Sequence, residues 1–455
     1  MFRNSRIRKM HLLGAAARIG GNDTSNFPHR LVLSALGALL MATAAFASGP
    51  GAETLAEKIV LTPQGGTARE DVEIQRWQER ALQPAAKADV FERLGWAYVA
   101  KARRTLDAGY YKLAEQTADV MDARFGAGAD SRLLRGHVLH NLHRFREAEV
   151  LARQLVQERS LPNDFALLSD VLMEQGKLAG AIEALQQMVN LKPGIEAYSR
   201  IAHLRWLKGD LAGAIDAMEQ AVRAGSPRDA ETYAWTLARL SGYYLQTGQA
   251  PRAVLVADSA IKAAPDYPPA LLARGRALLA QNQAAEAVAA LRRAAALNPL
   301  PEYQWWLADA LRSTGAEDDA VKMERELKAR GETSDPRTFA LFLATRRIDA
   351  MAAVALTRDE TANRADIFSQ DALAWALAAS GDYARAESVM QAALAEKTKD
   401  ARLLLHAGEI ALGRGQLAVA EAFFNEARPL SATLTPSERA LLAGHPGGSA
   451  VARAN

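Results

Sequence analysis

The sequence predicts an all-α protein, a right-handed solenoid of about ten helical hairpins. Alanine and leucine dominate the 455 residues, while aromatic residues make up only 6% and charged residues 24%, which is a helical composition. A helix–turn–helix pattern recurs along the chain, mostly at steps of 33 or 34 residues. One hairpin of that length cannot bury its apolar face alone, so the copies are expected to stack into an array.

The period is clearest at the turn between the two helices of each copy. Glycine suits the positive φ that such a turn tends to need, and the turn position holds, in order, Gly109, His143, Gly176, Gly209, Gly248, Asn282, Gly315, Ile348, Gly381 and Gly415. Alanine follows five residues later in every copy: Ala114, Ala148, Ala181, Ala214, Ala253, Ala287, Ala320, Ala353, Ala386 and Ala420. Seven residues before the turn, all copies but one carry a small residue: Ala102, Gly136, Ser169, Ala202, Ser241, Gly275, Ala308, Ala374 and Gly408.

Residues 268–299 are the most regular copy. Gly275 lies in the first helix, Asn282 at the turn, Ala287 in the second helix, and Pro299 closes the unit. These residues and their spacing resemble the tetratricopeptide repeat, and the resemblance covers about residues 85–430. The leucine that precedes the small residue in that family is present in several copies, as Leu94, Leu168, Leu240, Leu307 and Leu373.

Three copies depart from the pattern. In the first copy Gly95 lies about seven residues early, so either Gly95 or Ala102 is the small residue of that helix. Residues 224–229 lengthen the step to the next turn, and we expect them to form an exposed loop. Ile348 replaces the turn glycine in the eighth copy, where we expect a local bend in the array.

The N-terminal residues 1–47 have the features of a targeting segment. A basic stretch ending at Arg30 is followed by an apolar run, residues 31–47, that closes on Ala45-Phe46-Ala47. This pattern predicts a secretory signal peptide cleaved after Ala47 and a mature protein in the bacterial periplasm. The alternative is an uncleaved helix that anchors the protein in the inner membrane, facing the periplasm, and provides its only membrane contact.

The remaining flanks are assigned from local composition. Residues 48–84 are expected to form a linker, with strand character only at 58–61, and then a leading helix over residues 69–83. The predicted array spans residues 85–430. In residues 431–455 we expect a capping helix from Pro436 to Leu442 and a disordered tail. The leading helix offers four apolar side chains to cover the first repeat: Val72, Ile74, Trp77 and Leu82.

The net charge of +3 is concentrated in the leader. Residues 1–47 contain six basic residues and one acidic residue, a net charge of +5, so the other 49 basic and 51 acidic residues sum to −2. A nearly balanced array does not favour nucleic acid as a partner. Cysteine is absent, which excludes disulfides and thiolate metal sites.

The resemblance implies a concave groove lined by the first helix of each copy, with a protein or peptide as the partner. An aromatic side chain can anchor an extended peptide while a neighbouring charge sets its register. The alternative is that the tryptophans pack between neighbouring repeats. The residues at the groove-facing positions that we select are Trp96, His137, His140, His203, Trp206, Arg276, Trp305, Asp309, Arg312, Asp371 and Trp375. The lysine and asparagines of the family's carboxylate clamp are missing there.

No catalytic, cofactor or metal motif stands out in the sequence. His137 and His140 share a helix face and could ligate a metal, but His143 falls at the turn and no carboxylate recurs at ligand spacing. Phosphate-binding glycine loops, G-x-S-x-G and HExxH are absent. The sequence therefore predicts a non-enzymatic scaffold without cofactors that binds an extended peptide or partner protein in the cell envelope. The alternatives are an assembly factor for an envelope machine, such as a pilus or polysaccharide exporter, or a metal-carrying or enzymatic protein.

The cleavage prediction can be tested directly. N-terminal sequencing of the mature protein should read Ser48 as its first residue, because a signal peptidase cuts after the small residue at the end of the apolar run. A mature chain that retains Arg30 would contradict cleavage and support the membrane anchor.

Overall fold

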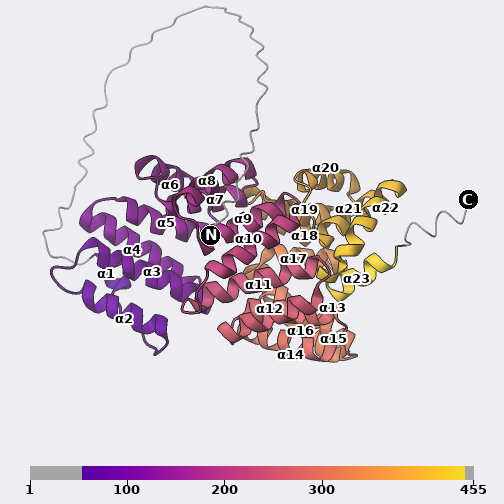
Figure 1. The fold of residues 1–455 in the computed structure, drawn as a ribbon, viewed down its shortest axis with the longest axis horizontal. Helices are drawn as coiled ribbons and strands as arrows, with labels where there is room; N and C mark the ends of the chain where they lie inside the picture. The colour runs from indigo at the N-terminus through magenta and orange to yellow at the C-terminus, as the bar shows by residue number, and fades with distance from the viewer. Residues whose placement is uncertain (1–53, 446–455) are drawn as a thin grey trace, which may run out of the picture. The chain divides into compact units, whose positions relative to one another are not determined.

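The computed structural model describes residues 54–445, in which helices are joined by turns and loops and there is no strand. Ten consecutive helical hairpins make up most of this range (Figure 1), which confirms the predicted fold class. The hairpins are α3 (Ala88–Thr105) with α4 (Gly109–Phe125), α5 (Ala129–Asn141) with α6 (Phe145–Glu158), α7 (Pro162–Glu174) with α8 (Leu178–Leu191), α9 (Ile195–Leu207) with α10 (Leu211–Ala224), α11 (Ala230–Gln246) with α12 (Ala250–Ala263), α13 (Pro268–Ala280) with α14 (Ala284–Leu297), α15 (Pro301–Ser313) with α16 (Glu317–Ser334), α17 (Pro336–Arg346) with α18 (Ala350–Asn363), α19 (Ile367–Ala379) with α20 (Tyr383–Leu394), and α21 (Ala401–Gly413) with α22 (Leu417–Ala427).

The turns within the hairpins are made by residues with positive φ, as the sequence predicted for eight of the ten copies. Six of these are glycines, and His143 and Asn282 adopt the same conformation, each with φ of 59°. In the first copy the positive-φ residue is Leu106, because α3 is extended to 18 residues and Gly109 instead begins α4. In the eighth copy it is Arg347 rather than Ile348.

The alanine column marks the closest approach of the two helices in a hairpin. All ten alanines are at most 2% exposed. The small residues seven positions before the turn are restricted in size by the same close approach. For example, a Cβ added to Gly275 would lie 2.5 Å from Cγ of Leu291 in the partner helix. In the first copy both candidates for the small position, Gly95 and Ala102, are buried. Alanine is therefore fixed by packing at this position, because a larger side chain would force the helices apart.

The N-terminal flank differs from the prediction in two ways. Residues 58–61 were expected to have strand character, but residues 58–60 are the end of α1 (Leu55–Val60), which packs on α4, and Leu61 is the C-cap of this helix. α2 (Arg69–Ala81) covers α3 with Ile74 and Trp77, whereas Val72 and Leu82 are exposed and do not contribute to this contact. The predicted loop at residues 224–229 is present between α10 and α11 and is mostly exposed.

The array folds back on itself, so that α7 to α10 contact the segments around α18 to α21 (Figure 1). The hydroxyl of Thr398 donates to the carbonyl of Leu207 at 2.5 Å, and Nε1 of Trp206 donates to the carbonyl of Lys399 at 3.3 Å. The indole of Trp206 also stacks on Phe368, with ring centroids 5.3 Å apart. These contacts form a seam between residues 162 to 193 positions apart in the chain.

Two turn glycines allow the seam to close. A Cβ added to Gly176 would lie 2.5 Å from the carbonyl oxygen of Ala365, and one added to Gly209 would lie 2.5 Å from that of Lys397. Both glycines also have positive φ, which L-residues adopt at a cost. Glycine at these turns therefore meets a steric requirement in addition to a conformational one.

The chain ends with a 3₁₀ helix, η1 (Arg428–Thr433), and the short helix α23 (Pro436–Ala443), close to the predicted capping helix. η1 contacts α11, α13 and α21, and α23 contacts α15. The terminal segment thus packs on first helices of four hairpins instead of only on the last one. The predicted leader and the tail beyond residue 445 lie outside the described residues.

Replacing Gly209 with alanine should destabilise the protein more than the same change at Gly315. Both glycines have nearly equal φ, 78° and 79°, but only Gly209 faces a backbone carbonyl. Gly315→Ala should cost about 1 kcal/mol through the left-handed conformation alone. Gly209→Ala should cost about 2–3 kcal/mol, because the seam must also shift. Urea denaturation of both variants measures the difference, and equal losses would show that the contact with Lys397 does not matter.

Candidate functional site

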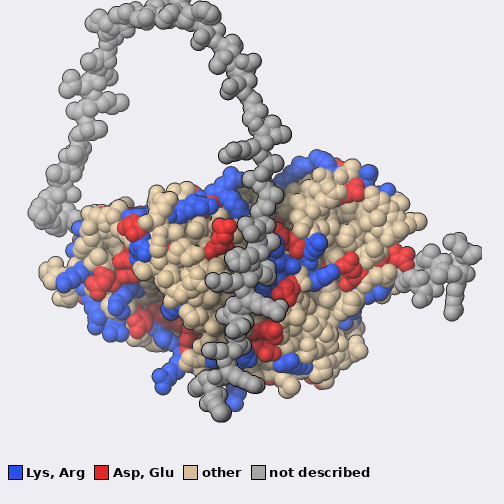
Figure 2. All heavy atoms as spheres, turned by 45° about the horizontal axis from the view of Figure 1, so that its top comes forward, with Lys and Arg blue, Asp and Glu red and all other residues tan. Residues whose placement is uncertain are grey.

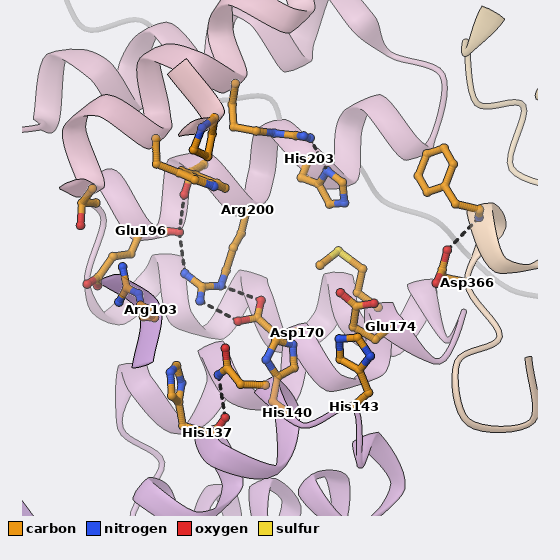
Figure 3. Close-up of a pocket in the computed structure, with 18 of the residues that line it drawn as sticks. Arg103, His137, His140, His143, Asp170, Glu174, Glu196, Arg200, His203 and Asp366 are labelled. Carbon is orange, nitrogen blue, oxygen red and sulfur yellow. Dashed lines mark hydrogen bonds and ion pairs between the residues drawn. The ribbon is translucent and has the colours of Figure 1, made fainter. Parts of the chain in front are cut away.

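A cavity of about 1950 Å³ lies inside the array. Its lining comes from the first helices α3, α5, α7, α9 and α11, from α20, and from the α12–α13, α14–α15 and α18–α19 connections. Figure 3 labels lining residues of α3, α5, α7 and α9 together with Asp366 of the α18–α19 connection. The seam therefore completes the wall. Five of the predicted groove residues face this space: Trp96, His137, His140, His203 and Trp206.

An ion pair at the centre of the wall fixes two charged side chains. Nε and Nη2 of Arg200 donate to Oδ1 and Oδ2 of Asp170 at 2.8 and 2.6 Å, and Nη1 donates to the carbonyl of Glu196 at 3.0 Å. Burial raises the pKa of Asp170, but the Arg200 charge and hydrogen bonds outweigh it and hold that pKa below its usual value. The bidentate geometry holds the guanidinium rigid within the cavity wall (Figure 3).

The histidines of the cavity are held neutral by burial. Burial lowers the pKa of His137 to about 4 and that of His203 to about 3, and it also lowers the pKa of His140. Nε2 of His137 and Nε2 of His140 are buried without a hydrogen-bond partner among the described residues. A neutral imidazole nitrogen can donate or accept one hydrogen bond. These two atoms are therefore unsatisfied polar groups in the cavity wall, which a ligand reaches when the side chains around them turn aside.

Aromatic rings flank the histidines on both sides of the cavity. The ring of Trp96 lies 5.2 Å from that of His137, and Trp206 lies 5.5 Å from His203. Nδ1 of His203 is 3.3 Å from Nη2 of Arg239. This alternation of rings and polar groups offers both apolar and hydrogen-bonding contacts to an extended chain.

Further charged residues enter the cavity from across the seam. Arg364 pairs with Glu174 at 2.5 Å and with Asp366 at 2.8 Å, which connects α7 with the α18–α19 connection. Arg337 lies 3.5 Å from Asp366. Sequence reasoning missed these residues as part of a site. The repeat register places each residue within its own hairpin and carries no signal for which distant hairpins come together.

The other six predicted groove residues do not line the cavity, and most are buried against the chain itself. Trp305 and Asp309 are 1% exposed, Asp371 is 2% and Trp375 is 5% exposed. Trp375 stacks on His406 at 4.2 Å between ring centroids, and Asp371 pairs with the same histidine at 2.9 Å. The expectation that these side chains are exposed in a groove is wrong, because neighbouring hairpins and the C-terminal segment cover them.

The two remaining predicted residues, Arg276 and Arg312, are half-buried and already paired. Nη2 of Arg276 donates to the carbonyl of Thr433 at 3.3 Å. Nη1 of Arg312 donates to Oε1 of Glu324 at 2.7 Å, and its Nε donates to Glu317 at 3.1 Å. The predicted groove is therefore divided into an open cavity in the first half of the array and a filled part in the second half.

Two other features were sought within residues 54–445. No group of three or more histidine, cysteine, aspartate or glutamate side chains there is arranged to hold a metal ion. None of the helices in the same range has the length and apolarity needed to cross a membrane. The apolar segment 31–47 lies outside this range.

Stacked hairpins with a cavity between their first helices define a helical-repeat solenoid. Family models of the tetratricopeptide repeat match residues 195–224, 272–335 and 372–434 of the chain. The chain is a tetratricopeptide-repeat protein. Proteins of this family are generally non-enzymatic and bind protein or peptide partners, so the fold indicates an interaction scaffold. No curated protein sequence matches the chain.

Several solved structures are similar in fold. A human IFIT1 dimer with PPP-AAAA is 12% identical, with a TM-score of 0.44 over 82% of this chain and 99% of that one. Yeast Tom70 is 13% identical, with a TM-score of 0.37 over 83% and 91% of the two chains. Pseudomonas aeruginosa pilF is 14% identical, with a TM-score of 0.38 over 48% and 96%. Similarity at this level says nothing about the partners of this chain.

Acid should destabilise the protein through its buried histidines. Between pH 6.5 and about 4 the unfolded chain protonates His137 while the folded chain does not, so the free energy of unfolding falls as pH falls. The contribution of His137 between pH 7 and 5 is about 2 kcal/mol. His137→Gln should flatten the dependence of the melting temperature on pH in that range. A slope identical to that of the wild type would show that His137 is not held neutral.

Proposed function

We propose that this protein is a scaffold that binds an extended segment of a partner protein inside its central cavity, in the cell envelope. The observation that carries the proposal is the cavity itself, about 1950 Å³ in volume, with Nε2 of His137 and of His140 buried in its wall and unpaired. Buried polar atoms without partners are costly, and a ligand that supplies hydrogen bonds recovers that cost. The amide groups of an extended peptide provide such bonds in both senses.

The chemistry of the lining favours a peptide over a polyanion. Six arginines and seven acidic residues line the cavity, so its charge is nearly balanced. Positive and negative side chains are also interspersed on the visible face of the described part of the molecule (Figure 2). Nucleic acid would meet carboxylates among the arginines of the lining, whereas a peptide with both polar and apolar side chains finds matching groups.

The rigidity of the wall supports the same proposal. Arg200 is fixed by Asp170 and Arg364 by Glu174, so these side chains lose little freedom when a ligand binds. Preorganised side chains improve affinity, because their conformational entropy has already been lost on folding. The aromatic rings of Trp96 and Trp206 add rigid apolar surface at either side.

The proposed location depends on the leader, residues 1–47, with its basic flank and apolar run. Cleavage after Ala47 would give a periplasmic scaffold. An uncleaved leader would give a scaffold anchored in the inner membrane, which suits an assembly factor for an envelope machine. Both forms present the same cavity to the same compartment.

Site-specific crosslinking in intact cells tests this function. A photoreactive amino acid placed at Asn163 or Glu196, which are exposed residues of the cavity lining, should yield an adduct with a partner protein. The same group at Gln154, exposed on the outer helix α6, is the matched control. Equal adducts from all three positions, or an adduct from Gln154 alone, would place the partner outside the cavity.

A further inference from the structure

The second half of the array holds a segment of its own chain where the sequence predicted a peptide. Residues 433–442 lie against α13, α15 and α21, which are first helices of three hairpins. Their contacts involve Arg276, Asp309 and Arg402, of which the first two are predicted groove residues. None of these three lines the central cavity. The contact region is therefore a separate site, and it does not depend on the cavity binding a ligand.

The segment is recognised by specific polar contacts. Oδ2 of Asp309 accepts hydrogen bonds from the backbone N–H of Ser437 at 3.0 Å and from its hydroxyl at 2.5 Å. Nε and Nη2 of Arg402 donate to the two carboxylate oxygens of Glu438 at 2.5 and 3.0 Å. Arg276 adds a hydrogen bond to the carbonyl of Thr433 at 3.3 Å. Side chains of three hairpins thus form hydrogen bonds with the backbone, a hydroxyl and a carboxylate of one short segment.

The segment has the form of a helix start. The hydroxyl of Thr435 accepts from the N–H of Glu438 at 3.3 Å, and Oε2 of Glu438 accepts from the N–H of Thr435 at 2.9 Å, which is a capping box. Pro436 occupies the first helical position, where its missing N–H costs nothing. The sequence Thr-Pro-Ser-Glu therefore holds Ser437 and Glu438 in a capped helix start where they contact the groove.

Apolar anchors on both sides of the helix start complete the contact. Leu434 is 1% exposed and Leu442 is 3% exposed, and both belong to a cluster with α21 and α22. Trp305 lies under the guanidinium of Arg402, 5.2 Å from its ring centroid. The segment therefore offers a leucine, a capped Ser-Glu pair and a second leucine to the groove.

The groove needs an occupant of this chemistry because its charges are buried. Asp309 is 1% exposed and also pairs with Arg346, while Glu438 is fully buried. Burial raises the pKa of Glu438, but the charge and hydrogen bonds of Arg402 outweigh it and keep the carboxylate ionised. Removing one partner of such a pair leaves an uncompensated charge, which is strongly unfavourable. A replacement segment must therefore bring its own carboxylate for Arg402.

We propose that the groove between α13, α15 and α21 is a second peptide-binding site, which residues 433–442 occupy within the same chain. Its partner ligand is a protein segment with the same chemistry: a capped helix start with a hydroxyl followed by a glutamate, flanked by leucines. Such a segment binds by displacing residues 433–442. A partner segment must bind the groove tightly enough to displace the chain's own segment. That segment is a strong competitor because it is tethered to the groove and so has a high effective concentration.

A labelled peptide of residues 431–445 tests the proposal on the full-length chain by fluorescence anisotropy. The double variant Ser437→Ala/Glu438→Ala weakens the internal segment, so it should bind the peptide about tenfold or more tightly than the wild type. A peptide with Glu438→Ala should lose this gain. Adding Arg402→Ala to the chain should remove binding, while Arg153→Ala, at an exposed arginine on the outer helix α6, should not. A folded double variant that does not bind the peptide, or binding that survives Arg402→Ala, would overturn the proposal.

Two further measurements guard against misfolding and against exchange between copies. In the wild-type chain, excess peptide should increase hydrogen exchange of residues 436–443, and unchanged protection would contradict displacement. Light scattering should show the double variant as the same species with and without peptide. A dimer that the peptide does not affect would assign the groove to the terminal segment of a second copy and overturn the partner that we propose.

Discussion

Closure of the array at the seam is the constraint on which the cavity depends. The turn glycines Gly176 and Gly209 let carbonyl groups of distant loops approach, and Thr398 and Trp206 add hydrogen bonds to that backbone contact. In a repeat protein, each repeat usually contacts only the repeats next to it in sequence. Here the cavity lies between hairpins that are about five repeats apart in the chain. The site therefore exists only in the closed array.

Much of the fold could be predicted from the sequence because the decisive interactions are local and repeated. The helix, the turn and the packing of helix on helix recur in each copy, so alanines such as Ala287 reveal the hairpin register without any knowledge of the rest. The two turns placed wrongly, at Gly109 and Ile348, lie in copies whose helices depart from the common length or sequence. In these two copies the turn residue with positive φ is Leu106 or Arg347, and not the residue that the repeat period selects.

The candidate site could be predicted only in part, because it is made by contacts that the period does not encode. His137, His140 and Trp206 face the cavity as expected from their position on first helices. Trp305 and Asp309 also lie on a first helix but are buried: the C-terminal segment contacts Asp309, while Phe342 and Arg402 pack on Trp305. That segment is 128 residues away from Asp309 in the chain, and its docking follows from the three-dimensional path of the array.

The seam also affects how the chain acquires its structure. Most contacts in a helical-repeat protein join residues close in sequence, which favours rapid stepwise folding. The pairing of Leu207 with Thr398 joins residues 191 positions apart and cannot form until both are present. Hairpins made early in synthesis can therefore stack as they emerge, but they enclose no cavity until the ninth hairpin and the connection after it have followed. Competence to hold a ligand in the cavity is thus reached late, near completion of the array.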